Sequence, residues 1–161
     1  MNERELLAVL SEDARRSTAD IARMLDADEA EVAAAIEDLE DAGIIQGYQA
    51  IVDWRAAEDQ RVRAEVELNV ALDRETNYAD IAERLAQFPE VVSLQLVSGD
   101  FDFLMRAEGS SMQEVSQFIS DKVAPVPEVT QTVTHYVMNT YKERGESFET
   151  DTGDDRLSVS P

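Results

Sequence analysis

The stretch from Val91 to Glu108, VVSLQLVSGDFDFLMRAE, contains two strand-like runs that meet at a glycine. In both runs apolar residues occupy every second position, which is the period of a strand with one buried face. These apolar residues are Val92, Leu94, Leu96, Phe101, Phe103 and Met105. Because Gly99 adopts positive φ at little steric cost, Ser98, Gly99 and Asp100 predict a tight hairpin turn. The hairpin then presents Asp100 and Asp102 at or near its tip.

The two aspartates at this tip allow two interpretations. They belong either to an ordinary solvated turn or to a polar clamp for a small cationic or amino-bearing ligand. In the clamp, the carboxylates would accept hydrogen bonds from the N–H groups of the ligand. The spacing of the two acids does not decide between a turn and a binding site.

The elements around the hairpin predict the rest of a small domain. A long half-buried strand is expected from Arg61 to Leu72, and a helix from Tyr78 to Phe88. A second helix follows the hairpin, with Met112, Val115, Ile119 and Val123 on its buried face, and a last strand runs from Val129 to Tyr141. The order β-α-β-β-α-β is typical of a ferredoxin-like fold, in which two helices cover one face of an antiparallel sheet.

The other face of this sheet is left without a covering layer. We expect Thr132 and Thr134 to lie beside Leu104 on a half-apolar exposed surface. A surface of that kind predicts at least a symmetric homodimer.

The N-terminal part of the chain carries a different pattern. Apolar residues recur at helical spacing from Glu3 to about Glu12, from near Ser17 to Leu25, and from Asp28 to Ala42, after which Gly43 ends the third helix. Three short helices with a tight turn between the last two predict a helix-turn-helix unit. The apolar segment Ile44–Trp54 is then expected to form a wing or linker strand.

The composition excludes several function classes. The chain of 161 residues has no cysteine and one histidine, His135, so disulfides, thiolate metal sites and most zinc and histidine chemistry are not expected. No Ser/His/Asp set and no phosphate-binding glycine loop is present, so we expect neither an enzyme nor a cofactor. The polar start MNERE and the lack of a long apolar run predict a cytoplasmic protein without a membrane anchor.

The net charge is strongly negative. Asp and Glu number 35 against 14 Lys and Arg, a net charge of −21, and the acids are spread along the whole chain. Such charge density favours adaptation to a saline cytoplasm, where salt screens the self-repulsion. The segment Glu143–Pro161 is expected to form a flexible acidic tail.

These features together resemble the Lrp/AsnC (feast/famine) transcriptional regulators, with an acidity that points to a haloarchaeal member. The resemblance covers Met1 to Tyr141, and the residues that carry it are Arg15, Ser17, Leu39, Glu40, Gly43, Ile44, Ile45, Gly47, Tyr48, Gly99 and Asp102. It implies a helix-turn-helix DNA-binding domain with a connector strand over residues 1–55. It further implies a ferredoxin-like effector-binding and oligomerisation domain over residues 61–141, followed by the acidic tail over residues 143–161.

The resemblance also implies site residues and partners. The DNA-binding residues would be Arg15, Arg16, Ser17, Thr18, Arg23, Glu29, Ala30, Ala33, Ala34 and Glu37. The effector-binding residues would be Ser98, Gly99, Asp100, Asp102, Thr132 and Thr134. The partners would be promoter DNA, a small amino-acid effector, and other copies of the chain in a homodimer or a higher homo-oligomer.

One departure from the family concerns DNA binding. Third helices of this family usually carry Arg or Lys on their exposed side, whereas no basic residue occurs between Met24 and Trp54 in this chain. Because Lys and Arg supply most non-specific DNA affinity, a second interpretation stays open. In it, the protein is an amino-acid-sensing oligomerisation protein whose acidic N-terminal unit binds proteins rather than DNA.

Overall fold

The computed structural model describes residues 2–59 and 61–148 of the chain. The chain divides into two compact units, Met1–Ala50 and Ile51–Pro161. Each unit has a hydrophobic core of its own, so each is described by itself.

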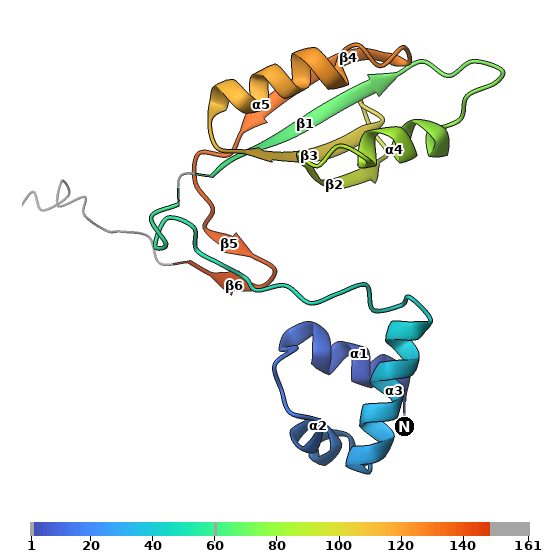
Figure 1. The fold of residues 1–161 in the computed structure, drawn as a ribbon, viewed down its shortest axis with the longest axis vertical. Helices are drawn as coiled ribbons and strands as arrows, with labels where there is room; N and C mark the ends of the chain where they lie inside the picture. The colour runs from blue at the N-terminus through green and yellow to red at the C-terminus, as the bar shows by residue number, and fades with distance from the viewer. Residues whose placement is uncertain (1, 60, 149–161) are drawn as a thin grey trace, which may run out of the picture. The chain divides into compact units, whose positions relative to one another are not determined.

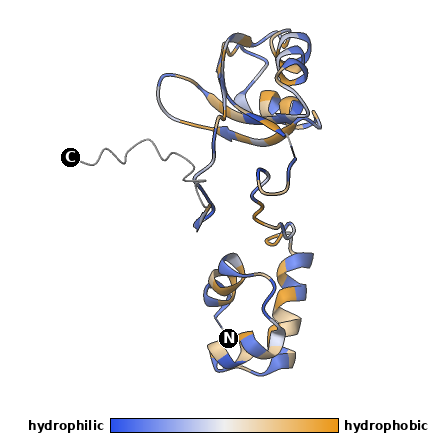
Figure 2. Ribbon diagram, turned by 90° about the vertical axis from the view of Figure 1, so that its left-hand side faces the viewer, coloured by the Kyte–Doolittle hydropathy of each residue, from blue (hydrophilic) through white to orange (hydrophobic). Residues whose placement is uncertain are grey.

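The N-terminal unit consists of α1 (Glu3–Glu12), α2 (Thr18–Leu25) and α3 (Glu29–Asp41). Each helix has an apolar side and a hydrophilic side, which Figure 2 shows as alternating colours along the ribbon. The apolar sides meet in a core formed by Leu6, Val9, Leu10, Ile21, Ala22, Val32 and Leu39. The three predicted helices are confirmed.

Local hydrogen bonds explain where these helices begin and end. The Ser17 hydroxyl accepts a hydrogen bond from the backbone N–H of Asp20 and so caps α2. Gly43 has a φ of +68°, and the following N–H groups of Ile44 and Ile45 donate to the carbonyl of Leu39. The glycine predicted to stop α3 therefore does so through left-handed backbone geometry.

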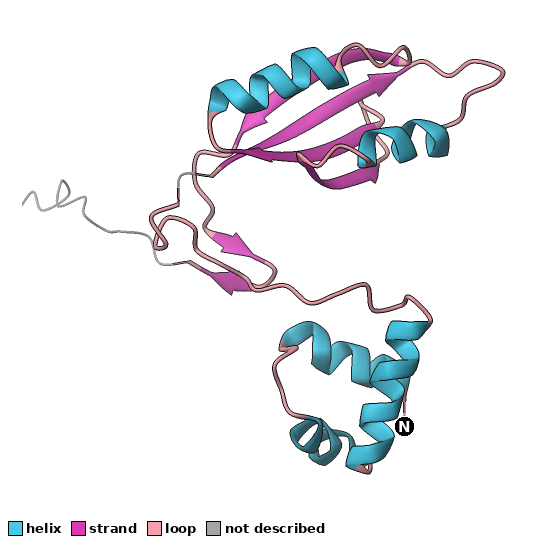
Figure 3. Cartoon of the chain, viewed as in Figure 1, coloured by secondary structure: helices cyan, strands magenta, loops and turns pink. Residues whose placement is uncertain are grey.

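The connector after α3 differs from the prediction. Ile44–Trp54 was expected to form a wing or linker strand, but the structure contains no strand there, as Figure 3 shows by its loop colour. The apolar side chains of Ile44, Tyr48 and Ile51 are exposed. The apolar pattern alone does not make a strand, because strand pairing needs a second segment alongside and no other described segment of the chain pairs with this one.

The second unit is an antiparallel sheet with two helical elements on one face (Figure 1). Along the chain, its main elements are β1 (Val62–Val70), α4 (Tyr78–Ala86), β2 (Val91–Leu96), β3 (Phe103–Gly109), α5 (Met112–Phe118), the π-helical turn η1 (Ile119–Val123) and β4 (Val129–Tyr136). The strand order is β2-β3-β1-β4. The predicted α+β fold class, a helix-turn-helix unit followed by a ferredoxin-like βαββαβ domain, is confirmed.

The core of this domain lies between the sheet and the helices. Alternate residues of β1 and β3 point into it, as predicted for both strands, and α4, α5 and η1 supply the opposing side chains. The buried residues are Ala64, Val66, Leu68, Ile81, Leu85, Phe103, Met105, Ala107, Val115, Phe118, Ile119 and Val123. Met112, predicted on the same helical face, is 54% exposed because it is the first residue of α5.

The alternation predicted for β2 is wrong in part. Leu94 packs against the core, but Val92 and Leu96 are 50% and 57% exposed. An irregularity in the pairing with β3 falls between Val91 and Ser93, and β2 is an edge strand. A bulge shifts the side-chain alternation by one residue, which turns Val92 away from the core. Leu96 lies on the same face as Leu94, since it pairs with the buried Phe103, and it is exposed at the end of the edge strand.

The open face of the sheet is also unlike the prediction. Thr132 and Thr134 pair with the buried residues Leu68 and Val66, so they lie on the helix-covered face, whereas Leu104 pairs with Glu67 and lies on the open face. The expected surface of threonines beside Leu104 does not form, and Leu104 and Val133 lie instead among charged cross-strand pairs on this face. These pairs are Arg63–Glu108 at 3.0 Å and Arg106–Glu65 at 2.6 Å, and beside them a hydrogen bond of 3.1 Å joins His135 Nε2 and Glu67 Oε1.

The C-terminal segment is more ordered than expected. The last sheet strand ends at Tyr136 rather than at Tyr141, and a short hairpin follows, made of β5 (Lys142–Glu143) and β6 (Glu146–Ser147). The flexible tail predicted from Glu143 is therefore wrong for residues 143–148. Its remainder, residues 149–161, lies outside the described residues.

Candidate DNA-binding and effector-binding sites

One hydrogen bond joins two of the predicted DNA-binding residues, Thr18 of α2 and Glu29 of α3. The Thr18 hydroxyl donates to Glu29 Oε1 at 2.8 Å, which links the first residue of α2 to the first residue of α3. Ala30, Ala33, Ala34 and Glu37 are exposed along α3. The outer side of α3 is therefore a surface of methyl groups and carboxylates.

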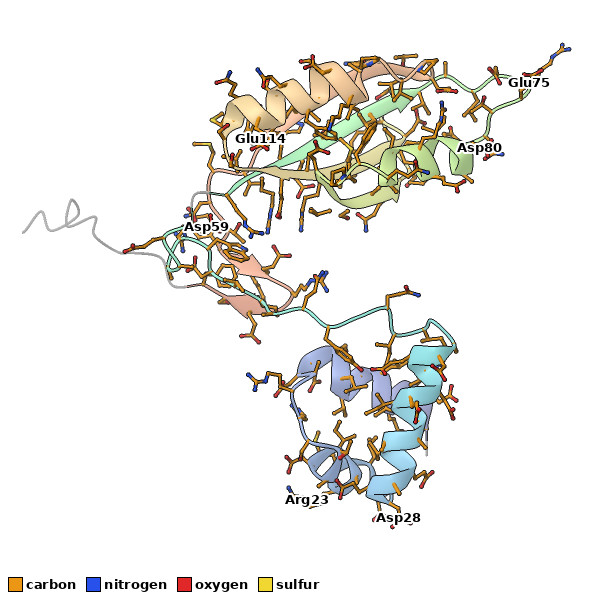
Figure 4. The ribbon with its side chains drawn as sticks, viewed as in Figure 1. Arg23, Asp28, Asp59, Glu75, Asp80 and Glu114 are labelled. Carbon is orange, nitrogen blue, oxygen red and sulfur yellow. The ribbon has the colours of Figure 1, made fainter. Side chains whose placement is uncertain are left out.

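Three of the four arginines of this unit, Arg15, Arg16 and Arg23, lie on α2 or just before it, and the fourth, Arg4, lies on α1. Arg16 is within 3.6 Å of Glu12 and 3.9 Å of Asp13, and Arg23 pairs with Asp20. Arg23 is 77% exposed and projects outward at the end of α2, as Asp28 does at the start of α3 (Figure 4). Acids thus compete with DNA phosphates for these two guanidinium groups, and salt screens both kinds of pair.

The β2–β3 hairpin has a wider turn than predicted. Its pairing ends at Leu96 and Phe103, and the Val97 N–H donates to the Asp102 carbonyl at 2.9 Å. Ser98, Gly99 and Asp100 lie exposed between these strands. Gly99 has a φ of +130°, and a Cβ placed on it would meet no atom within 4 Å, so the predicted need for glycine is confirmed and its surroundings are open.

Asp102 is fixed in orientation by contacts within the chain. Its Oδ2 accepts the backbone N–H of Val70 at 2.9 Å, and its Oδ1 accepts the Tyr78 hydroxyl at 3.2 Å. The negative charge of Asp102 raises the pKa of Tyr78 above its ordinary value, with help from desolvation and the hydrogen bond. The carboxylate is thus part of the join between the hairpin, β1 and the start of α4.

Other contacts hold the loop from the side of β1. The Asn69 side-chain amide donates to the Asp100 carbonyl at 3.1 Å, and the Thr130 hydroxyl donates to the Asn69 carbonyl at 3.1 Å. The pairing of β1 with β4 shifts register between Asn69 and Val70. Because of this irregularity, the Val70 N–H donates its hydrogen bond to Asp102 rather than to the neighbouring strand.

The structure brings together only part of the predicted effector set. Ser98, Gly99, Asp100 and Asp102 form one loop, but Thr132 and Thr134 lie on β4, with β1 between them and β3. Two strand spacings correspond to about 9.6 Å. The threonines are therefore separated from the loop by the width of β1.

Tyr78 and Asn69 were missed by reasoning from sequence. Tyr78 was predicted only as the first residue of its helix, and in the structure it packs edge-on to Phe103 with ring centroids 5.9 Å apart. Nothing in the sequence joins its hydroxyl to Asp102, because the contact crosses 24 residues and depends on how α4 sits on the sheet.

Two family models match the chain. One, described as the Lrp/AsnC ligand-binding domain, covers residues 63–147, and another, described as a winged helix-turn-helix DNA-binding domain, covers residues 2–46. The chain belongs to the Lrp/AsnC family. This Lrp/AsnC protein is a transcriptional regulator with a DNA-binding helix-turn-helix and a ligand-binding domain, and it is not an enzyme.

Known proteins agree with this assignment over nearly the whole chain. An uncharacterized HTH-type transcriptional regulator of Bacillus subtilis, YugG, is 36% identical over 99% of this chain and 96% of its own length. The regulator FL11 of Pyrococcus horikoshii is 25% identical over 89% and 92% of the two chains. Escherichia coli AsnC has the same fold, with a TM-score of 0.65 at 19% identity over 89% of this chain and 95% of that chain.

In the described part of this regulator, no helix is long and apolar enough to cross a membrane. Among the same residues, no cluster of His, Asp or Glu could hold a metal ion.

Proposed function

We propose that the ligand of this regulator is an amino acid that binds at the β2–β3 hairpin and changes how the protein binds promoter DNA. The observation that carries this proposal is the position of Asp102 beside Gly99. A carboxylate already held in orientation lies next to an exposed loop whose glycine leaves open space.

The hydrogen-bond capacity of Asp102 supports an ammonium partner. A carboxylate offers about four lone-pair sites, and Val70 and Tyr78 use two of them. An α-ammonium group has three N–H donors and would make charge-assisted hydrogen bonds with the remaining sites. Since the carboxylate is fixed before the ligand arrives, little ordering cost is left for binding.

A structural neighbour supports the class of ligand. A transcriptional regulator from Neisseria meningitidis was solved as a complex with L-Met. It covers 93% of this chain with a TM-score of 0.66, at 21% identity. We therefore propose a free amino acid for this chain, with Ser98, Asp100, Thr132 and Thr134 as further candidates for contacts with it.

We propose that DNA is held through a small number of phosphate contacts. Arg15, Arg16 and Arg23 are the arginines on and before α2, and the N-terminus of α3 can add backbone donors. The predicted α3 residues Glu29, Ala30, Ala33, Ala34 and Glu37 would then face the base edges, where alanine methyl groups contact thymine and glutamates accept from cytosine.

We also propose that the working form is a homodimer or a higher homo-oligomer. The exposed apolar side chains of Ile44, Tyr48 and Ile51 on the connector support this, since they would be covered by a second copy. Leu104 and Val133, half-buried among the ion pairs of the open sheet face, supply further apolar surface.

Calorimetric titration of the twenty amino acids in molar KCl tests the effector site. Asp102→Asn keeps one acceptor oxygen but loses the charge, so the affinity for the best ligand should fall roughly tenfold to a hundredfold. Tyr78→Phe is the matched control, because it removes a hydrogen bond from Asp102 without removing the carboxylate, and it should retain binding. If no amino acid binds the wild type, or if Asp102→Asn binds as tightly, the site is wrongly assigned.

A further inference from the structure

A cavity of about 130 Å³ lies within the second unit, at the end of the sheet opposite to the loop of the β2–β3 hairpin. It opens to solvent on one side and is bordered by the turn over residues 52–59, the start of β1, residues 137–140 and the β5–β6 hairpin; Figure 4 labels Asp59 in that turn. The volume corresponds to roughly four water molecules at 30 Å³ each. The cavity is therefore too small for a nucleotide-sized ligand and suits a compact one.

The walls of this cavity are held in place by charged side chains. The guanidinium of Arg61 lies 4.1 Å from the ring centroid of Trp54. Arg63 donates from Nε to Glu108 and from Nη1 to Glu143, both at 3.0 Å, which ties β1 to β3 and to the β5–β6 hairpin. A cavity whose walls are locked in this way is formed before a ligand binds.

One polar atom in the cavity wall has no partner. Asn139 lines the cavity, and its Oδ1 is buried without a hydrogen bond to any described residue. A buried acceptor that makes no hydrogen bond costs free energy, and such an atom usually marks a missing donor. A ligand with an N–H or O–H group would satisfy this acceptor.

The charge of the lining selects among such donors. The lining carries four carboxylates, those of Asp53, Asp59, Glu108 and Glu143, and three guanidinium groups, those of Arg55, Arg61 and Arg63. Each guanidinium group is paired within the chain: Arg55 with Asp53 at 3.3 Å, Arg61 with Asp59 at 3.2 Å, and Arg63 with Glu108 and Glu143 at 3.0 Å, while Arg106 lies 3.6 Å from Glu143. An anion would therefore have to displace a carboxylate of the chain, whereas the N–H groups of an ammonium ion can make charge-assisted hydrogen bonds with the lone pairs that remain on these carboxylates.

We propose that this cavity is a second small-molecule site, which takes a compact organic ammonium ion whose N–H donates to Asn139 Oδ1. The site is distinct from the hairpin and does not depend on the proposed effector there. The cavity adjoins the first residues of β1 and Asp102 contacts the last, so the nine residues of β1 place the two sites about 26 Å apart.

Three probes of similar size test the proposal on the full-length protein: ethanolamine as the cation, ethylene glycol as the neutral molecule and glycolate as the anion. Trp54 is the only tryptophan of the chain and lines the cavity, so its fluorescence reports on this site. Ethanolamine should change the fluorescence saturably, at concentrations on the order of millimolar for so small a probe. Ethylene glycol and glycolate should not.

Variants identify the atom that binds. Asn139→Leu should raise the Kd for ethanolamine at least roughly tenfold, and Asn139→Asp should lower it, because a carboxylate keeps the acceptor and adds charge. Gln131→Leu, an exposed change on β4, and Asp102→Asn should both bind like wild type. A wild type that does not respond, an equal response to glycolate, or an Asn139→Asp protein no tighter than wild type would each overturn the proposal.

Discussion

Asp102→Ala should destabilise the second unit, because two hydrogen bonds within the chain end on its carboxylate. The Val70 N–H donates at 2.9 Å in a part-buried position, and a hydrogen bond to a charged group contributes about 1.5–3 kcal/mol. The hydrogen bond from the Tyr78 hydroxyl is also part-buried but longer, at 3.2 Å, so it should contribute less, about 0.5–1 kcal/mol. The expected loss of unfolding free energy is therefore about 2–4 kcal/mol for Asp102→Ala.

Related variants divide this loss between the two hydrogen bonds. Asp102→Asn keeps one acceptor for Val70 and should cost about 1 kcal/mol, and Tyr78→Phe should cost about the share of the hydroxyl, 0.5–1 kcal/mol. Urea unfolding in molar KCl, followed by circular dichroism and by the fluorescence of Trp54, measures the differences. If Asp102→Ala lies within about 0.5 kcal/mol of wild type, the carboxylate is only a solvated turn residue and the reasoning is refuted.

Three further predictions concern charge. Raising KCl from about 0.01 M to about 1 M should raise the melting temperature, because the Debye length falls from about 30 Å to about 3 Å and salt then screens the repulsion among the acids of a chain with a net charge of −21. A melting temperature that does not change contradicts salt adaptation. The pKa of Tyr78 is raised in the folded state, so the protonated hydroxyl contributes stability that is complete below pH 10. This stability is lost as the pH rises through the folded-state pKa of Tyr78. A tyrosine absorbance titration should show that the pKa moves back towards its ordinary value in Asp102→Asn. Log–log plots of DNA affinity against salt should have a slope no steeper than about −5 for a bound dimer, about 0.9 for each of Arg15, Arg16 and Arg23 in the two protomers. An alanine at any one of them should reduce the slope by about 2, and a slope steeper than about −8 would mean that other cations contact the phosphates.

Much of the fold could be predicted because the spacing of apolar residues within one segment is enough to identify a helix or a strand. The helices around Ile21 and Ile81 and the alternation in β1 and β3 follow from apolar spacing that each segment shows by itself. The alternation in β2 could not be predicted, because the irregularity near Val91 depends on how β2 pairs with β3. The same holds for the connector, whose apolar pattern has no partner strand in the described chain.

The candidate site shows the same division between local and distant information. Gly99 could be predicted because its positive φ is a property of one turn. The contacts of Asp102 with Val70 and Tyr78 join residues 32 and 24 positions apart, and no local pattern encodes them. The placement of Thr132 on the helix-covered face likewise required the register of β4 against β1, which the sequence pattern left open.

The most direct test is the affinity of the full-length protein for the DNA upstream of its own gene, measured by fluorescence anisotropy in low and in molar KCl. The measurement is made with and without the amino acid that binds most tightly. The amino acid should change the affinity of the wild type by a factor between roughly 5 and 150, the usual range of coupling between two sites, and it should leave Asp102→Asn unchanged at the same concentration. A folded protein that binds no DNA at either salt concentration, or an equal response in wild type and Asp102→Asn, would contradict the account.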